Sequence, residues 1–366
     1  MSPRDGRRAT NSPGGGSRTD ASVEPGHPTD QLLRDLGARA RLTLATHLGP
    51  PRRLAYVNYP NHGNAGDPAL WLGGLRLLEE LGHDIVHHCE PRTYAPEALA
   101  AQRPDAIVIN GGGNLGDRYP RQQRVREAVL RDFPDVPTVQ LPQSVHFSDR
   151  AALARMQRLV AAHRSLTILL RDEVSLARAR NWFDAPSHRC PDLAFGLTLR
   201  SRAATARCDV LWLARDDKEA AGYTPPVDGL DAEVTDWLGT IDDEPAWSWR
   251  HRRALTINRR LTPKVAAGGA PARRWREVLA ATYAPLAEAR VLRGMRILAR
   301  GRVVVTDRLH GHVLSLLQGI EHVVLDNADG KVRALYDADT HAAGIAHLAE
   351  DAADARRIVD GLLSRD

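Results

Sequence analysis

Short apolar runs alternate with helical patterns along most of this chain, and that alternation restricts the folds it can adopt. Runs such as Leu54–Tyr59, Ala106–Asn110 and Leu166–Leu170 are short and rich in aliphatic residues, as buried strands are. Segments with the spacing of an amphipathic helix follow two of these runs, at Pro68–Leu81 and at residues 173–182. This alternation is typical of a parallel sheet with helices on both faces. The sequence therefore predicts an α/β fold.

A change of composition divides the predicted elements into two groups. The chain has 366 residues and is 43% hydrophobic, which is enough for two cores. Residues 200–207 are polar and irregular, and a new apolar strand at Asp209–Ala214 begins directly after them. We therefore expect an N-terminal α/β domain at residues 31–205 and a C-terminal one at residues 206–366.

Two segments lack a regular pattern. Residues 1–30 are rich in Arg, Gly, Pro and Ser and contain no apolar run of the kind found in signal peptides, so we expect a disordered tail. Residues 222–269 look irregular and are expected to form an insertion or a mobile loop. This insertion carries Trp247 and Trp249, for which two roles stay open: stacking on a sugar ring, or packing of the loop itself.

The charge of the chain argues against nucleic-acid binding. It carries 50 Lys and Arg residues against 45 Asp and Glu residues, a formal net charge of +5. The basic residues are nearly all arginines and are scattered, whereas a nucleic-acid site needs a clustered basic face. No run of about 18 apolar residues is present for a membrane-spanning helix. These features favour a soluble enzyme, and cysteines that are odd in number and far apart favour the reducing cytoplasm.

A metal site is not expected either. The three cysteines, Cys89, Cys190 and Cys208, are far apart and form no C-x-x-C pair. His310 and His312 are two residues apart at a predicted helix start, where their side chains need not converge. No H-E-x-x-H pattern accompanies them.

One predicted strand delivers an unusual set of polar residues to its carboxyl end. The β-branched run Val303–Thr306 is followed directly by Asp307 and Arg308 and then by His310, at the start of a predicted helix. Lys331 follows about one βα unit later. Open α/β sheets bind ligands at the carboxyl ends of their strands. There Arg308 can bind an anion, and His310 can transfer a proton near neutral pH.

Three further motifs follow predicted strands of the first domain. Asn64 and Asp67 lie in a glycine-rich turn, with Asp67 expected as the N-cap of the next helix. Asn114 lies in a second glycine-rich turn at residues 110–117, which lacks the dinucleotide-binding spacing and a Walker lysine. Arg171 directly follows a strand, and arginine is suited to bidentate binding of carboxylate or phosphate. A purely structural role stays open for each motif.

Together, four motifs resemble the polysaccharide pyruvyltransferase family. They are Gly63–Asp67, Gly111–Asp117 with Leu141–Ser144, Leu170–Ser175 and Thr306–His312. Their order and spacing match that family across roughly residues 54–340. The resemblance implies two Rossmann-like domains facing a cleft, as in GT-B glycosyltransferases. It also implies that the enolpyruvyl group of phosphoenolpyruvate is transferred to a sugar, forming a pyruvate ketal and releasing phosphate.

The resemblance also assigns roles to individual residues. It implies that His310 is the catalytic histidine, our candidate for the general acid. The donor phosphoenolpyruvate would be bound by Arg171, Arg308, Leu309 and Lys331. Four other residues would be structural or lie on the acceptor side: Asn64, Asp67, Asn114 and Gln143. Apart from phosphoenolpyruvate as donor substrate, no cofactor and no metal are expected.

The implied partners are phosphoenolpyruvate and a sugar of a polysaccharide or of its lipid-linked precursor. A lipid-linked acceptor would bring the protein to the inner surface of the membrane. The polymer stays open between a capsule, an exopolysaccharide and another glycan of the cell envelope.

Two other functions stay open on the sequence. A nucleotide-sugar-dependent GT-B glycosyltransferase would share the expected topology. A non-catalytic anion- or saccharide-binding protein would share the scaffold, but it has no need for Arg171, Arg308, His310 and Lys331 together.

Overall fold

The computed structural model describes residues 28–198, 202–217, 219–238 and 247–365. Its strands are β1 Arg53–Val57, β2 Asp84–Cys89, β3 Ala106–Ile109, β4 Gly112–Gly116, β5 Thr138–His146, β6 Leu166–Leu170, β7 Ser187–Arg189, β8 Cys208–Leu213, β9 Ala232–Thr235, β10 Gly301–Thr306, β11 His322–Val324 and β12 Ala346–Leu348. Its helices are α1 Pro28–Leu48, α2 Gly66–Glu80, α3 Pro96–Ala101, α4 Pro120–Asp132, α5 Arg150–Ala162, α6 Glu173–Trp182, α7 Trp249–Ala266, α8 Gly269–Ala280, α9 Tyr283–Leu298, α10 Leu309–Leu317, α11 Lys331–Leu335 and α12 Ala352–Leu363, with short turns η1 Leu193–Gly196 and η3 Tyr336–Thr340.

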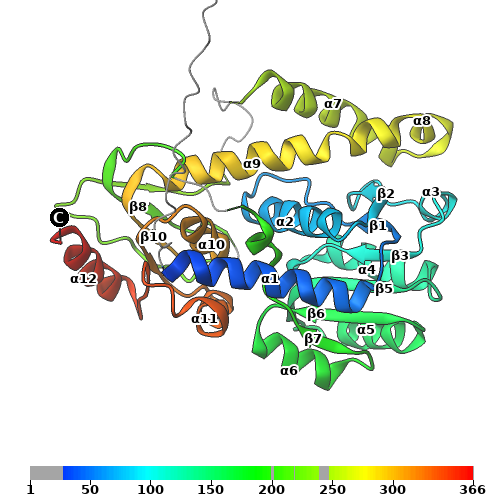
Figure 1. The fold of residues 1–366 in the computed structure, drawn as a ribbon, viewed down its shortest axis with the longest axis horizontal. Helices are drawn as coiled ribbons and strands as arrows, with labels where there is room; N and C mark the ends of the chain where they lie inside the picture. Colours follow the sequence, from blue (N-terminus) through cyan, green and yellow to red (C-terminus); the bar gives the residue numbers. More distant parts are fainter. Residues whose placement is uncertain (1–27, 199–201, 218, 239–246, 366) are drawn as a thin grey trace, which may run out of the picture.

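The strands form two parallel sheets (Figure 1). The first sheet has the order β2-β1-β3-β5-β6-β7, with β4 paired to β5, and the second has the order β12-β11-β10-β8-β9. Helices connect most of the successive strands, as is usual for parallel pairing. The predicted α/β class with parallel sheets is therefore confirmed.

The strand registers bring the carboxyl ends of neighbouring strands to one edge. Thr306 of β10 pairs with Leu213 of β8 and with Val324 of β11. In the first sheet, Val57 of β1 pairs with Ile109 of β3. Residues that directly follow these strands therefore leave each sheet at a shared edge, which is where the predicted site residues stand.

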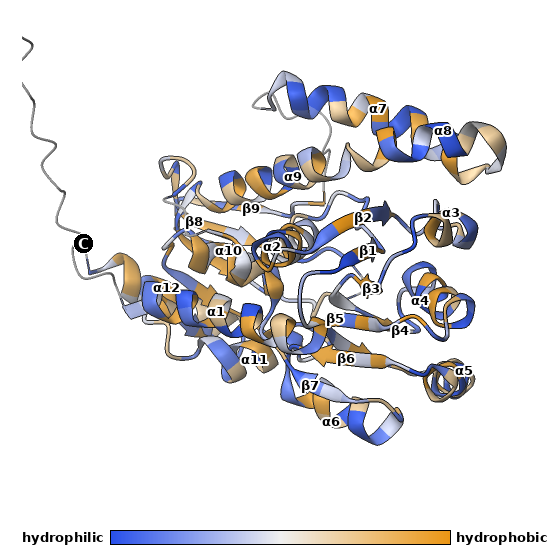
Figure 2. Cartoon of the chain, turned by 45° about the vertical axis from the view of Figure 1, so that its right-hand side comes forward, coloured by the Kyte–Doolittle hydropathy of each residue, from blue (hydrophilic) through white to orange (hydrophobic). Residues whose placement is uncertain are grey.

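Most strands are apolar because helices cover both faces of the sheets. All residues of β3 are buried, and so are Val303–Thr306 of β10. Figure 2 shows hydrophobic residues concentrated in strands such as β3 and β6, whereas hydrophilic and hydrophobic residues alternate along helix α7. None of the helices in the described ranges has the length and apolar character needed to span a membrane.

The two halves of the chain share their hydrophobic cores. One buried cluster joins Leu36 of α1 to Leu314 of α10, and another joins Leu261 of α7 and Tyr283 of α9 to Trp71 of α2. In Figure 1, α1 runs along both halves, and the long helix α9 reaches from the second sheet to α2. The strands thus divide between Arg189 and Cys208, whereas the helices pack across that division.

The predicted boundary of the disordered tail, residue 30, lies too far along the chain. Residues 28–30 belong to α1, which begins at Pro28, a favourable first residue for a helix. The helix buries Leu33, Leu36, Ala40 and Leu44, whose spacing places them on one face. Residues 1–27 of the predicted tail lie outside the described residues.

The expectation of an irregular insertion at residues 222–269 is wrong in large part, because this stretch contains β9 and α7. Ser248 caps α7 by accepting a hydrogen bond from the backbone N–H of His251. The many arginines of α7 obscure its hydrophobic pattern in the sequence. Its buried residues nevertheless recur at helical spacing: Ala254, Leu255, Asn258, Leu261, Thr262 and Val265. Two further helices, α8 and α9, follow α7 along the chain. Residues 239–246 lie outside the described residues.

The second glycine-rich motif is partly a strand rather than a turn. Residues Gly112–Gly116 form β4, which pairs with β5. Gly116 has a φ of 144°, and a Cβ atom there would collide with the backbone carbonyl of His146. Glycine allows this close approach, so the residues that suggested a turn permit a tightly paired strand.

Candidate active site

A pocket of about 440 Å³ is lined by residues that follow strands of both sheets. Asn58 and Asn110 follow β1 and β3, and Arg171 follows β6; Arg308 and Asn327 follow β10 and β11. Among the residues predicted for the site, only Gln143 is absent from its lining. The others all contribute to it: Asn64, Asp67, Asn114, Arg171, Arg308, Leu309, His310 and Lys331.

His310 stands in the first turn of α10 beside a buried carboxylate. Its Nε2 lies 3.4 Å from Oδ2 of Asp192, whose side chain is fully buried. Gly66, at the start of α2, packs so closely against the imidazole ring that a Cβ atom there would overlap it. The ring is thus confined between Asp192 and the start of α2.

Asp192 also binds Arg171. Nη1 of Arg171 lies 2.8 Å from Oδ2 of Asp192, and its Nε donates a hydrogen bond to Oγ of Ser144 at 3.0 Å. Burial raises the pKa of Asp192, but the charges of His310 and then Arg171 outweigh this effect and hold that pKa well below its ordinary value. One ionised carboxylate therefore positions both the predicted general acid and a predicted donor-binding arginine.

Arg308 is held by carboxylates of the second half. Its Nε and Nη2 each donate a hydrogen bond of 2.6 Å to Asp236, in a bidentate arrangement, and Nη2 lies 3.4 Å from Asp217. The guanidinium also lies over the ring of Trp237, 5.6 Å from its centroid. Burial raises the pKa of Asp217, but a hydrogen bond from Arg215 and other contacts outweigh it and lower that pKa to about 2.

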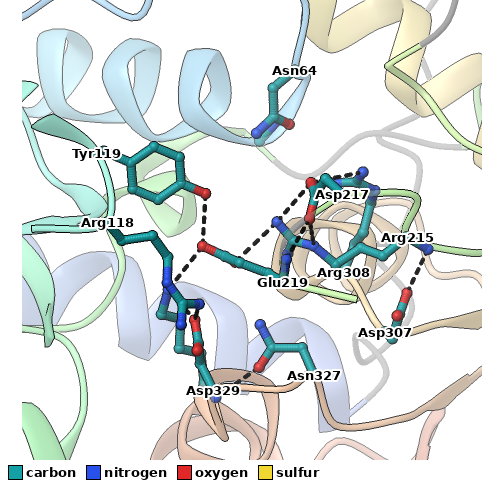
Figure 3. A network of polar contacts seen from close by, with 12 residues as sticks. Asn64, Arg118, Tyr119, Arg215, Asp217, Glu219, Asp307, Arg308, Asn327 and Asp329 are labelled. Carbon is teal, nitrogen blue, oxygen red and sulfur yellow. Dashed lines mark hydrogen bonds and ion pairs between the residues drawn. The ribbon is translucent and has the colours of Figure 1, made fainter. Parts of the chain in front are cut away.

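Lys331 belongs to a network that joins the two halves. Figure 3 shows Arg118, Tyr119, Glu219 and Asp329 of this network. Nζ of Lys331 lies 3.1 Å from Oε1 of Glu219 and 2.8 Å from Oδ2 of Asp329. Tyr119, at the start of α4, donates a hydrogen bond of 2.7 Å to Glu219, and Arg118 pairs with Asp329. These contacts tie the start of α4 to the loops that follow β8 and β11.

Two of the predicted donor-binding cations converge on Gly113. A Cβ atom built at Gly113 would lie 3.4 Å from Nη2 of Arg171 and 3.4 Å from Nζ of Lys331. These two cations come from different sheets, so the backbone of β4 marks the point where the charged groups of both halves meet.

Asn64 and Asp67 are arranged differently from the prediction. Helix α2 begins at Gly66, so Asp67 lies in its first turn and is not its N-cap. Asn64 instead accepts a hydrogen bond from the backbone N–H of Gly66 and donates one to Asp67 at 3.2 Å. Asp67 also lies 3.3 Å from Nε2 of His62. Asn64 rather than Asp67 therefore satisfies a backbone N–H at the start of α2.

Gln143 lies behind the pocket and fixes Asn114. Its Oε1 accepts a hydrogen bond from the backbone N–H of Asn114, and its Nε2 donates to Oδ1 of the same residue at 3.1 Å. Arg126, whose pKa burial lowers to about 9, donates to that oxygen at 2.7 Å. These bonds hold β4 against β5 and orient Asn114 at the pocket wall.

His312 does not join His310 at the site. It is fully buried, with Nδ1 2.7 Å from Nε2 of His322 and Nε2 2.8 Å from Oγ1 of Thr340. Over the described ranges, no three His, Cys, Asp or Glu side chains are grouped as a metal ion would require.

This buried histidine pair predicts a pH dependence of stability. Burial lowers the pKa of His312 well below its ordinary value and that of His322 to about 4. Unfolded histidines titrate near pH 6.5, so between about pH 4 and 6.5 the unfolded state binds more protons than the folded state. The free energy of unfolding should therefore fall as the pH decreases through this window. Urea unfolding at several pH values should show a shallower slope for His322→Gln, and an unchanged slope would contradict the assignment.

The two candidate tryptophans lie outside the pocket. Trp247 packs in a small buried cluster with Leu255 and Leu286, and Trp249 is 69% exposed. Of the two roles left open, packing therefore describes Trp247. Trp237, which the sequence did not single out, lines the pocket instead.

Sequence reasoning also missed the carboxylates that hold the predicted cations. They are Asp192, Asp217, Glu219, Asp236 and Asp329. Each lies within a few residues of a strand end, after β7, β8, β9 or β11. Applied to acidic residues, the rule that singled out Arg171 and Arg308 could have found Asp217 and Glu219, which follow the predicted strand at Asp209–Ala214, but not Asp236, which follows the unpredicted strand β9.

Comparison with known proteins decides the family. The model of the family described as polysaccharide pyruvyl transferase matches residues 64–329 of this chain. The chain belongs to this family. The matched range contains every predicted site residue of this transferase except Lys331. The family makes the protein a pyruvyltransferase enzyme and implies a polysaccharide-type acceptor.

Curated relatives of the transferase agree with this membership. Pyruvyl transferase 1 from Schizosaccharomyces pombe is 30% identical over 312 residues, which cover 79% of this chain and 70% of the relative. EpsO from Bacillus subtilis is 29% identical over 279 residues, covering 76% of this chain and 82% of the relative.

A solved structure has a similar fold. The crystal structure of KP1_0663 from Klebsiella pneumoniae aligns with a TM-score of 0.53 and 17% identity, over 86% of this chain and 99% of that chain. At this identity the similarity concerns the fold of the transferase alone.

Proposed function

We propose that the transferase takes phosphoenolpyruvate as its donor and joins two hydroxyls of a saccharide through a pyruvate ketal, releasing phosphate. The observation that carries this proposal is the convergence of Arg171, Arg308, Lys331 and His310 on one pocket. Phosphoenolpyruvate presents a phosphate and a carboxylate, and the three cations supply charge-assisted donors for both. His310 supplies the proton that the reaction needs.

The first chemical step protonates the donor. His310 gives its proton to the methylene carbon, which becomes a methyl group, and the neighbouring carbon acquires oxocarbenium character. A saccharide hydroxyl attacks that carbon and returns a proton to the imidazole. Arg171, Arg308 and Lys331 balance the charge of the donor during this step.

The second step closes the ketal. A second hydroxyl oxygen bonds to the same carbon, and the phosphate leaves with the electron pair of its carbon–oxygen bond. The proton of the first hydroxyl replaces the one that His310 gave to the methylene carbon. The proton of the second hydroxyl leaves with the phosphate. Asp192 contacts both His310 and Arg171, so it sets the acid at a fixed place relative to the bound donor.

Thermal unfolding with candidate ligands tests the donor. A ligand that binds only the folded state stabilises it by RT ln(1 + [L]/Kd), about 2.7 kcal/mol when the ligand stands at 100 times Kd. We expect phosphoenolpyruvate to raise Tm and nucleotide sugars to leave it unchanged. Phosphate release with a matching ketal mass on an acceptor then establishes the reaction. Stabilisation by a nucleotide sugar alone would transfer the proposal to a GT-B glycosyltransferase.

A substitution at Gly113 locates the donor in this pocket. The Val side chain in Gly113→Val would fill the space beside Nη2 of Arg171 and Nζ of Lys331, each 3.4 Å from a Cβ atom there. Loss of one charged hydrogen bond should raise the Kd for phosphoenolpyruvate at least about tenfold in calorimetric titration. Gly361→Val is the matched control, because a Cβ atom at Gly361 has no neighbour within 4 Å. Equal donor affinity in both variants would place the donor elsewhere.

A further inference from the structure

Helix α7 lies on the outside of the molecule, beyond α9 (Figure 1 and Figure 2). Its buried face borders a cavity of about 450 Å³, which Leu255 and Asn258 line together with Asn61 and His62 of the loop after β1. Asn61 and His62 also line the candidate active site. Helix α7 therefore stands beside that site, although the proposed donor chemistry uses none of its residues.

Basic residues gather on α7 and α8, whereas the sequence suggested that they were scattered. Residues 249–280 contain nine Lys and Arg residues and one acidic residue, Glu277, which gives a net charge of +8. The remaining 41 basic and 44 acidic residues of the chain give −3. Three acidic residues, Asp242, Asp243 and Glu244, precede α7 and lie outside the described residues. Even with these three counted, nine basic against four acidic residues give residues 239–280 a net charge of +5, that of the whole chain. This region is therefore where an anionic partner is attracted most strongly.

Four exposed residues follow one another along the outer face of α7: Trp249, Arg253, Arg260 and Lys264. Their spacings of four, seven and four residues place them on one side of a helix with about 3.6 residues per turn. We call these four residues the α7 stripe. At about 1.5 Å per residue, the stripe is roughly 22 Å long.

The cations of the α7 stripe are available to a partner. Over the described ranges, no carboxylate lies within 4.0 Å of Arg253, Arg260 or Lys264. Arg250, which is not part of the stripe, lies 3.7 Å from Glu288. Trp249 is 69% exposed, so its indole ring is open to contact as well.

An exposed indole beside unpaired guanidinium groups suits a saccharide that carries carboxylates. The indole offers a flat apolar surface against which the C–H groups of a sugar ring can pack. A guanidinium binds a carboxylate through two parallel hydrogen bonds. The stripe contains one such ring and three cations in a row, which fits a chain of sugars better than a single one.

We propose that the α7 stripe binds an anionic saccharide chain whose acidic groups are carboxylates, such as those of pyruvate ketals. This inference rests on the proposed function, which generates carboxylate-bearing units beside α7. The stripe lies on the opposite side of α7 from Asn258, so the thickness of a helix, about 10 Å, separates it from the cavity beside the site. It therefore holds units of the chain that lie away from the reacting sugar.

The stripe suits a saccharide chain better than two other polyanions. The apolar residues of α7 are buried in the protein, so the helix presents no apolar face to insert between lipid headgroups. Single-stranded nucleic acids stack their bases on successive aromatic side chains, and the stripe has one. Carboxylate-bearing saccharides are also the polyanions that the proposed reaction itself produces.

Calorimetric titration of the full chain with linear oligogalacturonate tests the stripe, with phosphoenolpyruvate at saturation to occupy the cations of the active site. We expect oligogalacturonate to bind and its neutral methyl ester to bind at least about tenfold more weakly. The double variant Arg253→Gln with Arg260→Gln should raise the Kd for oligogalacturonate at least about tenfold. Trp249→Ala should raise it about threefold or more.

The matched control is the double variant Arg155→Gln with Arg158→Gln. It removes the same charge from exposed positions of α5, which lies far from α7 in Figure 1. Its Kd should stay within about twofold of that of the wild type. All the substituted side chains are exposed, so we expect every variant to fold as the wild type does.

Several results would overturn the proposal. Equal Kd values in the two double variants would mean that net charge alone attracts the saccharide. Equal affinity for the methyl ester, or no binding of oligogalacturonate, would contradict recognition of carboxylates. Tighter binding of phosphatidylglycerol vesicles would assign the stripe to a membrane surface, and tighter binding of single-stranded DNA would assign it to nucleic acid. Failure of phosphoenolpyruvate to bind in its own titration refutes the proposed donor, whereas failure of oligogalacturonate alone refutes only the role of the stripe.

Discussion

His310→Asn is expected to lower the rate of phosphate release by about 10²- to 10⁴-fold, the usual contribution of a positioned general acid. The affinity for phosphoenolpyruvate should stay within about twofold of that of the wild type, because Arg171, Arg308 and Lys331 remain in place. The two measurements are the turnover rate at saturating substrates and calorimetric titration of the donor. A loss of donor binding of the same size as the loss of rate would make His310 a binding residue rather than the acid.

His62→Asn is the matched control for this prediction. His62 lines the same pocket and lies 3.3 Å from Asp67, but it contacts no carboxylate as buried as Asp192. We expect its variant to keep turnover within about tenfold of wild type, less than the loss of a general acid. If His62→Asn proves the more damaging of the two, the assignment of the proton donor must move to His62.

Arg308→Gln should raise the Kd for phosphoenolpyruvate by roughly tenfold or more, since each charged hydrogen bond contributes about 1.5–3 kcal/mol. The same change removes the bidentate partner of Asp236 and leaves that carboxylate uncompensated in a largely buried place. Breaking a buried ion pair costs about 3–5 kcal/mol of stability. Urea unfolding and donor titration should therefore both respond.

The double variant Arg308→Gln with Asp236→Asn separates these two effects. It removes both charges of the pair, so most of the lost stability should return. Donor affinity should stay as low as in Arg308→Gln, because the guanidinium is still missing. Recovery of affinity together with stability would mean that Arg308 only supports the fold.

The parallel sheets could be predicted because most of their strands are short apolar runs with turn residues at their ends, although β4 and β9 are not. The rule that ligands bind at the carboxyl ends of strands then brought Arg171, Arg308 and His310 to one place, although they come from two sheets. Lys331 was suggested by its rarity in a chain that uses arginine almost throughout. These predictions rest on local sequence patterns, which can be recognised without knowing the tertiary contacts.

The elements that were missed depend on packing between distant segments. Helix α7 is rich in arginine, and its buried face becomes recognisable only when it lies against α9 and the first sheet. Asp192 follows the short strand β7 and shows its importance only when His310 arrives from more than a hundred residues later. The glycine at position 66 is needed for that same histidine and not for a turn.

The carboxylates paired with Arg171, Arg308 and Lys331 also bear on how each catalytic cycle ends. Because these cations already share their charge with Asp192, Asp236 and Asp329, a small anion gains little by binding to any one of them. In the proposed reaction, phosphoenolpyruvate engages them with two anionic groups at once, whereas the leaving phosphate has only one. The cleaved product should therefore depart readily, and inorganic phosphate should be a weak product inhibitor.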